Sequence, residues 1–176
     1  MSFLRSSYTA LTWAGAPLVL AYLRWRSFKG REDKIRLPER RGVTNIPRPE
    51  KPLLWIHAVS VGESMVALTL IQAILKQFPR IHVLLTTTTT SSAKIVEKRL
   101  PKNTTHQFCP ADTPQAVHRF LEHWKPDLAI WIESEFWPNL MHGAQKRGIP
   151  TILLNGRISL KSFSNLATLA SIMFRQ

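Results

Sequence analysis

The sequence predicts an α/β protein built on a Rossmann-like parallel sheet. The chain has 176 residues, of which 44% are hydrophobic and 20% are charged, so it is long enough to bury the core of one domain. From residue 53 onward, short apolar runs alternate with segments whose apolar residues have helical spacing. Strands that alternate with helices form right-handed β-α-β crossovers, which produce a parallel sheet covered by helices on both faces.

Five strands are expected, each a short run rich in apolar or β-branched residues. The first is the uninterrupted run LLWIHA at 53–58, and the others lie at 81–86, 106–109, 128–133 and 151–155. Ligands bind at the carboxyl ends of such strands, near the point where strand order reverses. If the strands take the usual order 3-2-1-4-5, the loops after the first and fourth strands flank that crevice.

Five helices are expected between and after the strands. The third begins at Pro114, with Asp112 or Thr113 as its cap, and the fourth ends before Gly148. The helices are predicted at 65–77, 91–100, 114–124, 139–147 and 160–174.

Residues 1–26 are expected to form an apolar helix that anchors the protein to a membrane. Residues 6–23 contain no charged side chain, and Trp13 and Tyr22 lie near the two ends of this stretch, as interfacial anchors do. Its length is at the lower limit of the roughly 17–25 residues that a span requires, and Pro17 would kink it. A single-pass helix and a helix lying in the interface both fit this pattern. A cleaved signal peptide fits poorly, because no small-residue cleavage site precedes the basic residues that follow.

The net charge of +13 favours an anionic partner. Eight lysines and arginines and only three acids occur at 24–41, directly after the apolar segment. This pattern is typical of a protein that faces anionic lipid on the cytoplasmic side of a membrane, although a solvated linker also fits. No aromatic and basic motif indicates nucleic-acid binding. Residues 27–52 are basic and rich in proline, and they are expected to be a linker into a domain at 53–176.

The sequence gives no sign of a metal or a cofactor. Cys109 is the only cysteine, so the chain has no internal disulfide, and no histidine and cysteine cluster has metal-ligand spacing. Neither a G-x-G-x-x-G fingerprint nor a P-loop follows a predicted strand.

Candidate site residues occur in three loops. The loop after the first strand contains Ser60, Gly62 and Glu63. Gly62 allows a positive φ or a close approach of the backbone, and Glu63 falls in the first turn of the next helix, where a carboxylate is stabilised by the helix dipole. Glu63 therefore fits either a catalytic carboxylate or an acidic residue that only stabilises the N-terminus of the helix.

The loops after the fourth and fifth strands add two more acids and an arginine. Glu133 and Glu135 are separated by one residue, so both can face the same side of a strand end. Crowded carboxylates raise one another's pKa, which suits a general base, but Glu135 also fits a helix cap. Arg157 can meet an anionic group or a carboxylate at the same edge, or lie at the surface near a helix start.

Three motifs resemble those of the Kdo transferases, where Kdo is 3-deoxy-D-manno-octulosonic acid. They are HAVSVGE at 57–63, ESEFWPN at 133–139 and NGRIS at 155–159, and their order and separations also match. The family pattern at the second motif is close to E-T-E-L-W-P-N, so Ser134 and Phe136 depart from it while both acids are kept. Gly156 stands where the family usually has alanine. The resemblance covers nearly the whole chain.

The resemblance implies a GT-B glycosyltransferase that transfers Kdo from CMP-Kdo to lipid IVA, the lipid A precursor, at the cytoplasmic side of the bacterial inner membrane. Glu63 matches the general base and Glu133 a second acid that assists the transition state. Ser60, Gly62, Glu135 and Arg157 are expected to bind substrate. The chain corresponds to the acceptor-side half, and the C-terminal domain that binds the donor is absent from it. The alternative is a non-catalytic, membrane-attached remnant or a lipid A-binding module.

Overall fold

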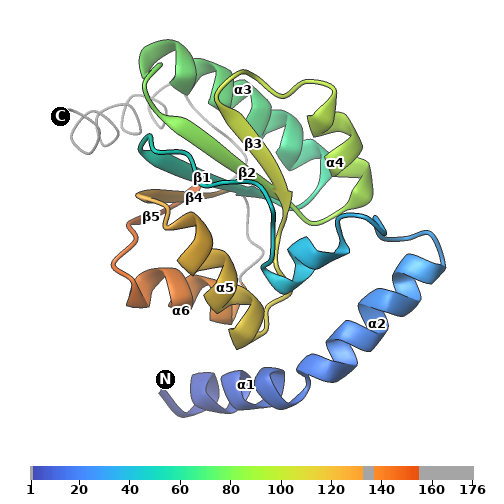
Figure 1. Cartoon of the computed structure of the whole chain (residues 1–176). Coiled ribbons are helices and arrows are strands. Elements are labelled where there is room, and N and C mark those ends of the chain that lie inside the picture. The colour runs from blue at the N-terminus through green and yellow to red at the C-terminus, as the bar shows by residue number, and fades with distance from the viewer. Residues whose placement is uncertain (1, 133–136, 155–176) are drawn as a thin grey trace.

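A computed structural model describes residues 2–132 and 137–154, with the side chains described from residue 6 onward. Its centre is a five-stranded parallel sheet with the order β3-β2-β1-β4-β5, which confirms the predicted Rossmann-like α/β fold and the assumed strand order (Figure 1). The strands are β1 (Leu53–Ala58), β2 (His82–Thr87), β3 (Thr104–Phe108), β4 (Leu128–Ile132) and β5 (Thr151–Leu154).

Helices cover both faces of the sheet, as a parallel sheet requires (Figure 1). One face packs against α3 (Val61–Gln77) and α4 (Thr90–Glu97) through an aliphatic cluster that includes Ile56 and Ile71. The other face packs against α5 (Pro114–Trp124) and α6 (Pro138–Lys146) through an aromatic cluster. In that cluster the Trp55 ring lies 5.0 Å from Phe120 and 5.2 Å from Trp131, measured between centroids.

The predicted elements agree with the structure apart from a few boundaries. The expected strand at 53–58 and the helix at 114–124 match β1 and α5 in full. The first helix of the domain begins at Val61, four residues earlier than expected, because Ser60 caps it. The helix expected at 160–174 lies outside the described residues.

The N-terminal segment forms two helices, α1 (Ser2–Ala14) and α2 (Ala16–Phe28), which we call the arm. The break falls at Gly15, next to Pro17 in the first turn of α2, where the missing proline N–H costs no hydrogen bond. Within the described ranges, no helix has the length and apolar character needed to cross a membrane. Anchoring of the arm stays a prediction.

Polar contacts hold α1 against the domain. The Tyr8 hydroxyl donates to Asp112 Oδ2 at 2.9 Å, and the Thr9 hydroxyl donates to Asn139 Oδ1 at 3.0 Å. The Asn139 amide in turn donates to the Thr12 hydroxyl at 2.9 Å. One side of α1 therefore packs against α5 and α6. Its Leu11 and Trp13 side chains are 72% and 62% exposed.

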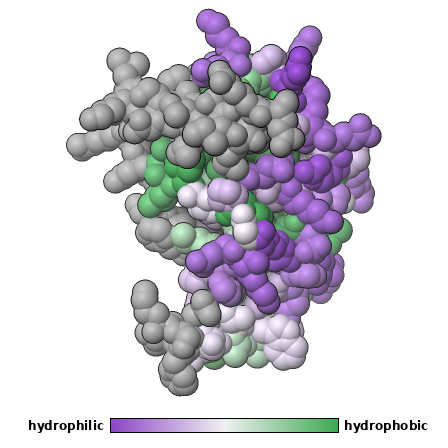
Figure 2. Space-filling view, turned by 90° about the vertical axis from the view of Figure 1, so that its left-hand side faces the viewer, coloured by the Kyte–Doolittle hydropathy of each residue, from purple (hydrophilic) through white to green (hydrophobic). Residues whose placement is uncertain are grey.

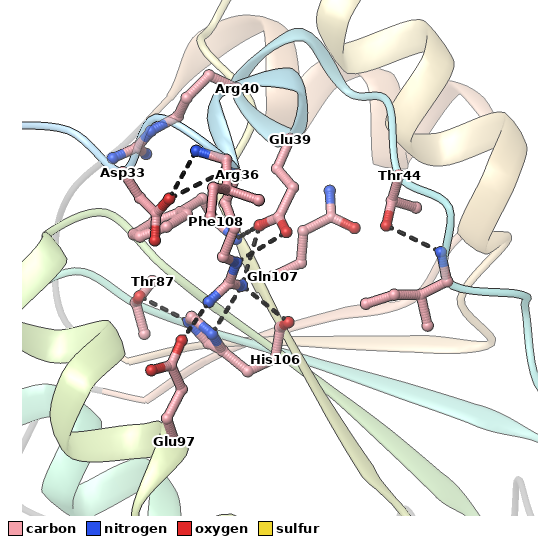
Figure 3. A network of polar contacts seen from close by, with 12 residues as sticks. Asp33, Arg36, Glu39, Arg40, Thr44, Thr87, Glu97, His106, Gln107 and Phe108 are labelled. Atoms are coloured by element: carbon pink, nitrogen blue, oxygen red, sulfur yellow. Dashed lines mark hydrogen bonds and ion pairs between the residues drawn. The ribbon is translucent and has the colours of Figure 1, made fainter. Parts of the chain in front are cut away.

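The segment expected to be a linker, residues 27–52, contains the 3-10 helix η1 (Leu37–Arg41) and a network of ion pairs (Figure 3). Arg36 pairs with Glu39 at 2.9 Å and with Glu97 at 2.6 Å, and Arg40 pairs with Glu32 at 3.1 Å. Glu32, Glu39 and Arg40 are at most 8% exposed. Paired charges at this depth tie the segment to the domain, since removing one partner would leave the other buried and uncompensated.

The surface at the β5 side of the molecule is shown in Figure 2. Much of it is hydrophilic, and hydrophobic residues lie next to the atoms that are drawn in grey. β5 is an edge strand, and its Leu153 side chain is 50% exposed.

Candidate active site

The candidate site lies where β1 and β4 end side by side. These two strands are paired in register, with His57 opposite Trp131, and strand order reverses at β1. The chain runs from β1 through Val59 and Ser60 directly into α3. The switch point of the sheet and the N-terminus of α3 therefore meet at one place, which is where α/β sheets bind their ligands.

Glu63 is held at this place by the cap of α3. The Ser60 hydroxyl accepts the Glu63 backbone N–H at 3.3 Å, and the Glu63 Oε2 accepts the Val59 backbone N–H at 2.6 Å. This resembles a capping box, in which the serine hydroxyl accepts the backbone N–H of a glutamate three residues later and the glutamate side chain accepts the backbone N–H of the serine. Here the glutamate accepts the N–H of Val59, one residue before the serine. The Glu63 side chain is half-buried, and Oε1 has no hydrogen-bond partner in the described part of the chain. Among the described residues, the carboxylate is thus positioned through Oε2 alone.

Gly62 has no structural need to be glycine within the chain. Its φ is not positive, so the interpretation that it serves a left-handed turn is wrong. A Cβ atom at Gly62 would meet only the Ser60 hydroxyl, at 3.9 Å, which is an ordinary contact. The exposed Gly62 backbone instead leaves space beside Glu63, consistent with the close backbone approach that the sequence suggested.

A buried cluster of hydrogen-bonded side chains, formed by Trp55, His57 and Thr86, lies near the end of β1. The Thr86 hydroxyl accepts the Trp55 indole N–H at 2.9 Å and lies 2.9 Å from His57 Nδ1. Burial lowers the pKa of His57 to about 4, with Arg40 adding to the effect, so this imidazole is neutral at pH 7. His57 is therefore a hydrogen-bonded residue of the core. In the described ranges, His57 Nε2 and Trp131 Nε1 have no hydrogen-bond partner.

Arg40 is a residue of this edge that the sequence did not single out. Its guanidinium donates to the backbone oxygens of Thr88 and Cys109, which follow β2 and β3. It also lies over the Phe108 ring, 4.7 Å from the centroid. The basic stretch at 24–41 indicated lipid, and no local pattern distinguished the buried Arg40 from its exposed neighbours.

Asp112 is a second residue whose role was not predicted. The sequence predicted Asp112 or Thr113 as the cap of α5, and Thr113 occupies the N-cap position without a side-chain hydrogen bond to the helix. Asp112 instead accepts the backbone N–H groups of Asn139 and Leu140 at 3.1 and 2.8 Å and so caps α6. Burial raises the pKa of the Asp112 carboxyl, and the bonds it accepts oppose that effect. Capping across 27 residues of sequence leaves no local signal.

Of the predicted site residues, the structure places three and brings them together. Ser60, Gly62 and Glu63 form the first turn of α3 and its cap at the switch point. Glu133, Glu135 and Arg157 lie outside the described residues. Among the residues that the structure does describe, no three histidine, cysteine or acidic side chains are grouped to hold a metal ion.

Comparison with known proteins points to one family. The family described as "3-Deoxy-D-manno-octulosonic-acid transferase (kdotransferase)" matches residues 35–176. The chain is 44% identical over 161 residues to an Arabidopsis thaliana protein named "Probable 3-deoxy-D-manno-octulosonic acid transferase, mitochondrial". It is 42% and 34% identical, over 158 and 159 residues, to the 3-deoxy-D-manno-octulosonic acid transferases of Rickettsia bellii and Haemophilus influenzae.

These matches cover most of this chain but a smaller part of each relative. They include 92% of the chain for the Arabidopsis protein and 90% for the other two. The chain spans 36%, 38% and 37% of the length of these curated relatives, respectively.

Proposed function

The chain belongs to the 3-deoxy-D-manno-octulosonic-acid transferase family, and from this premise we propose that it is the acceptor-side part of a glycosyltransferase that moves Kdo from CMP-Kdo to lipid IVA. The reaction joins an acceptor sugar oxygen to the anomeric carbon of Kdo with inversion. The bond from that carbon to the CMP phosphate breaks, and CMP leaves with the electron pair. The resemblance assigns CMP-Kdo to a second domain.

The position of the Glu63 carboxylate is the observation that carries this proposal. A general base must stand within hydrogen-bond reach of the proton that it takes, in a fixed orientation. Glu63 Oε2 is fixed by the Val59 N–H at 2.6 Å at the switch point of the sheet, while Oε1 has no hydrogen-bond partner among the described residues. The proton of the acceptor hydroxyl would pass to Glu63 as the hydroxyl oxygen attacks. Gly62 leaves room for the acceptor beside it, and Ser60, Glu135 and Arg157 are proposed to bind substrate, with Glu133 assisting the transition state.

The arm supports a proposal about location. We place the protein at the cytoplasmic face of the bacterial inner membrane, where the basic residues at 24–41 meet anionic lipid. Trp25 and Phe28 on α2 are 49% and 81% exposed, so the arm offers apolar side chains next to that charge. An interfacial helix accounts for both features, because its apolar side enters the headgroup boundary and its basic residues remain at the surface.

The test is Kdo transfer from CMP-Kdo to lipid IVA in the presence of a donor-binding domain from a relative. We expect product with the wild-type chain and a loss of about 10²–10⁴ in rate with Glu63→Gln, which keeps the size of the side chain but removes its basicity. Glu50→Gln, at an exposed position before β1 and so at the opposite end of that strand from Glu63, is the matched control and should transfer at the wild-type rate. Unfolding by urea checks that Glu63→Gln is folded.

Each other outcome is informative. Wild-type turnover by Glu63→Gln would remove Glu63 from the role of base. Lipid IVA binding without product, from folded protein with an active donor domain, would favour the non-catalytic lipid A-binding module.

A further inference from the structure

A groove runs beneath α2, between the arm and the domain. It consists of two adjoining cavities of about 370 and 210 Å³, which share Leu20 and Arg41. The larger cavity lies between the bend of the arm and the start of α5, and much of its lining is apolar, including Trp13, Pro17, Val19, Leu20 and Ala116. The smaller continues toward η1 along Leu23, Leu37 and Pro38.

Cations line the same groove. Arg41 and Arg119 belong to the larger cavity, and Arg24 and Lys34 to the smaller. All four side chains are exposed, and in the described ranges none of them forms an ion pair. Arg119 donates to the Arg41 carbonyl oxygen at 3.3 Å, which brings these two residues together.

The acids of this stretch do not neutralise the rim. Glu32 is paired with Arg26 and Arg40, and Glu39 is paired with Arg36. Asp33 accepts two backbone N–H groups at 2.9 and 3.1 Å and lines neither cavity. The groove therefore combines an apolar wall with uncompensated positive charge, which is the complement of an anionic amphiphile.

We propose that this groove binds one acyl chain of an anionic bilayer phospholipid, with the lipid phosphate on Arg41 and Arg119. Guanidinium groups bind phosphate oxygens by charge-assisted hydrogen bonds, and the apolar wall receives the chain. A bilayer lipid is the occupant because the outer side of the arm is apolar too. Its Leu18 and Phe28 side chains are 76% and 81% exposed, so the groove adjoins a surface suited to lipid.

The inference rests on the proposed membrane attachment and makes a stricter claim, namely a saturable site for a single lipid molecule. The probe is monomeric dihexanoylphosphatidylglycerol below its micelle concentration, with binding measured by titration calorimetry. We expect one molecule bound per chain. Dihexanoylphosphatidylcholine, which has the same chains and no net charge, should bind much more weakly.

Two pairs of variants test the two halves of the groove. Leu20→Trp should abolish binding, because Leu20 lines both cavities, whereas Leu18→Trp, on the exposed side of the same helix, should bind as the wild type does. The double variant Arg41→Gln and Arg119→Gln should bind about 30-fold more weakly, since each cation near anionic lipid contributes about fivefold. Lys98→Gln with Lys102→Gln removes the same charge from exposed positions outside the groove and should have no effect.

Flotation with phosphatidylglycerol vesicles distinguishes failure of this inference from failure of the proposed attachment. If the wild-type protein floats but binds no monomeric lipid, or if Leu20→Trp and Leu18→Trp bind it equally, the groove is not a lipid site and attachment still stands. If the protein binds monomeric lipid and does not float, the groove stands and attachment of the arm fails. Arg41→Lys with Arg119→Lys should retain most of the binding, and equal urea midpoints exclude misfolding as the cause of a loss.

Discussion

Buried histidines make the stability of this domain sensitive to acid. Burial lowers the pKa of His57 to about 4, and burial together with Arg36 and Arg40 lowers the pKa of His106 to about 3. Both side chains nonetheless make hydrogen bonds, His57 to Thr86 and His106 to Thr87, each at 2.9 Å. They are built into the fold as neutral groups, and protonation requires a charge to be placed in the core.

The sign of the pH effect follows from these pKa values. An unfolded chain protonates its histidines near pH 6.5, whereas the folded protein keeps these two neutral down to about pH 4 and pH 3. The contribution of these two histidines to the free energy of unfolding should therefore be constant above their unfolded pKa of about 6.5. It should fall as pH drops from 6.5 toward 4, by up to about 1.4 kcal/mol per pH unit for each histidine. Urea denaturation at several pH values measures this slope.

Replacement of His57 isolates its share. His57→Asn keeps a polar group opposite Thr86 and removes the titrating ring. The slope of the free energy of unfolding against pH should therefore decrease by the equivalent of about one bound proton, or about 1.4 kcal/mol per pH unit. An unchanged slope in His57→Asn would contradict the assignment of a neutral buried His57.

At the scale of elements, η1 depends on a close approach to α5. Gly42, at the end of η1, has a φ of 73°, and a Cβ atom there would lie 2.0 Å from the Ala116 carbonyl oxygen. Gly30 has nearly the same φ, 71°, with nothing within 4 Å of such an atom. The two glycines therefore separate the cost of backbone strain from the cost of a steric clash.

We expect Gly42→Ala to be much more destabilising than Gly30→Ala. The second carries only the left-handed penalty of about 1–2 kcal/mol. The first adds overpacking against backbone that cannot move away, for a total of roughly 2–5 kcal/mol. Urea midpoints of the two variants give the comparison, and equal losses would mean that η1 can withdraw from α5 at little cost.

The cap of α6 is another contact between distant elements. Asp112 accepts two backbone N–H groups of α6 and the Tyr8 hydroxyl of α1. Asp112→Ala should lower the free energy of unfolding by about 1–2 kcal/mol through loss of the cap, and it should also loosen α1.

Tyr8→Phe is the matched control for this prediction, because it removes the contact with α1 and leaves the cap intact. It should cost about 1 kcal/mol or less. Hydrogen exchange then distinguishes the two, because α6 amides should become less protected only in Asp112→Ala.

The strands of the sheet could be predicted from the sequence because parallel strands buried on both faces consist of continuous apolar runs. The runs at 53–58 and 128–132 required no knowledge of partners, and the crossover rule then left few possible orders. The apolar spacing put the start of α3 at residue 65, four residues late, although Glu63 was correctly assigned to the first turn of this helix. Ser60 and Glu63 form a capping pattern that could have revealed the true start.

Other features could not be predicted because they depend on pairs that are distant in sequence. Arg40 bonds to Cys109, 69 residues away, and Asp112 bonds to Asn139, 27 residues away. From residue type alone, Arg40 was grouped with the basic residues that face lipid, and Asp112 was a candidate cap of α5. For the candidate site, the sequence placed Glu63 at the switch point, but the hydrogen bond that fixes its carboxylate needed coordinates.

At the scale of the whole molecule, the proposed membrane attachment of the arm would combine two kinds of attraction. The basic residues act at long range and are screened by salt, while exposed apolar side chains such as Leu18 and Phe28 act on contact. We expect flotation with phosphatidylglycerol vesicles to weaken when salt is raised from 0.1 M to 1 M, since the Debye length falls from about 10 Å to about 3 Å.

Part of the binding should survive at high salt because apolar insertion is not screened. Leu18→Ser with Phe28→Ser should remove this residual part and leave the salt-sensitive part. Complete loss of wild-type flotation at high salt would mean that the arm touches the membrane by charge alone.

The distance in sequence between the arm and its partners has a consequence for synthesis on the ribosome. Tyr8 and Thr9 bond to residues 104 and 130 positions later. At about 5–20 residues per second, the arm therefore emerges roughly 5–25 s before its docking surface exists. During that interval Tyr8 and Thr9 do not yet have these partners, and the arm is not docked on the domain. If the proposed attachment holds, translation order favours a nascent chain that reaches the membrane before its domain has folded.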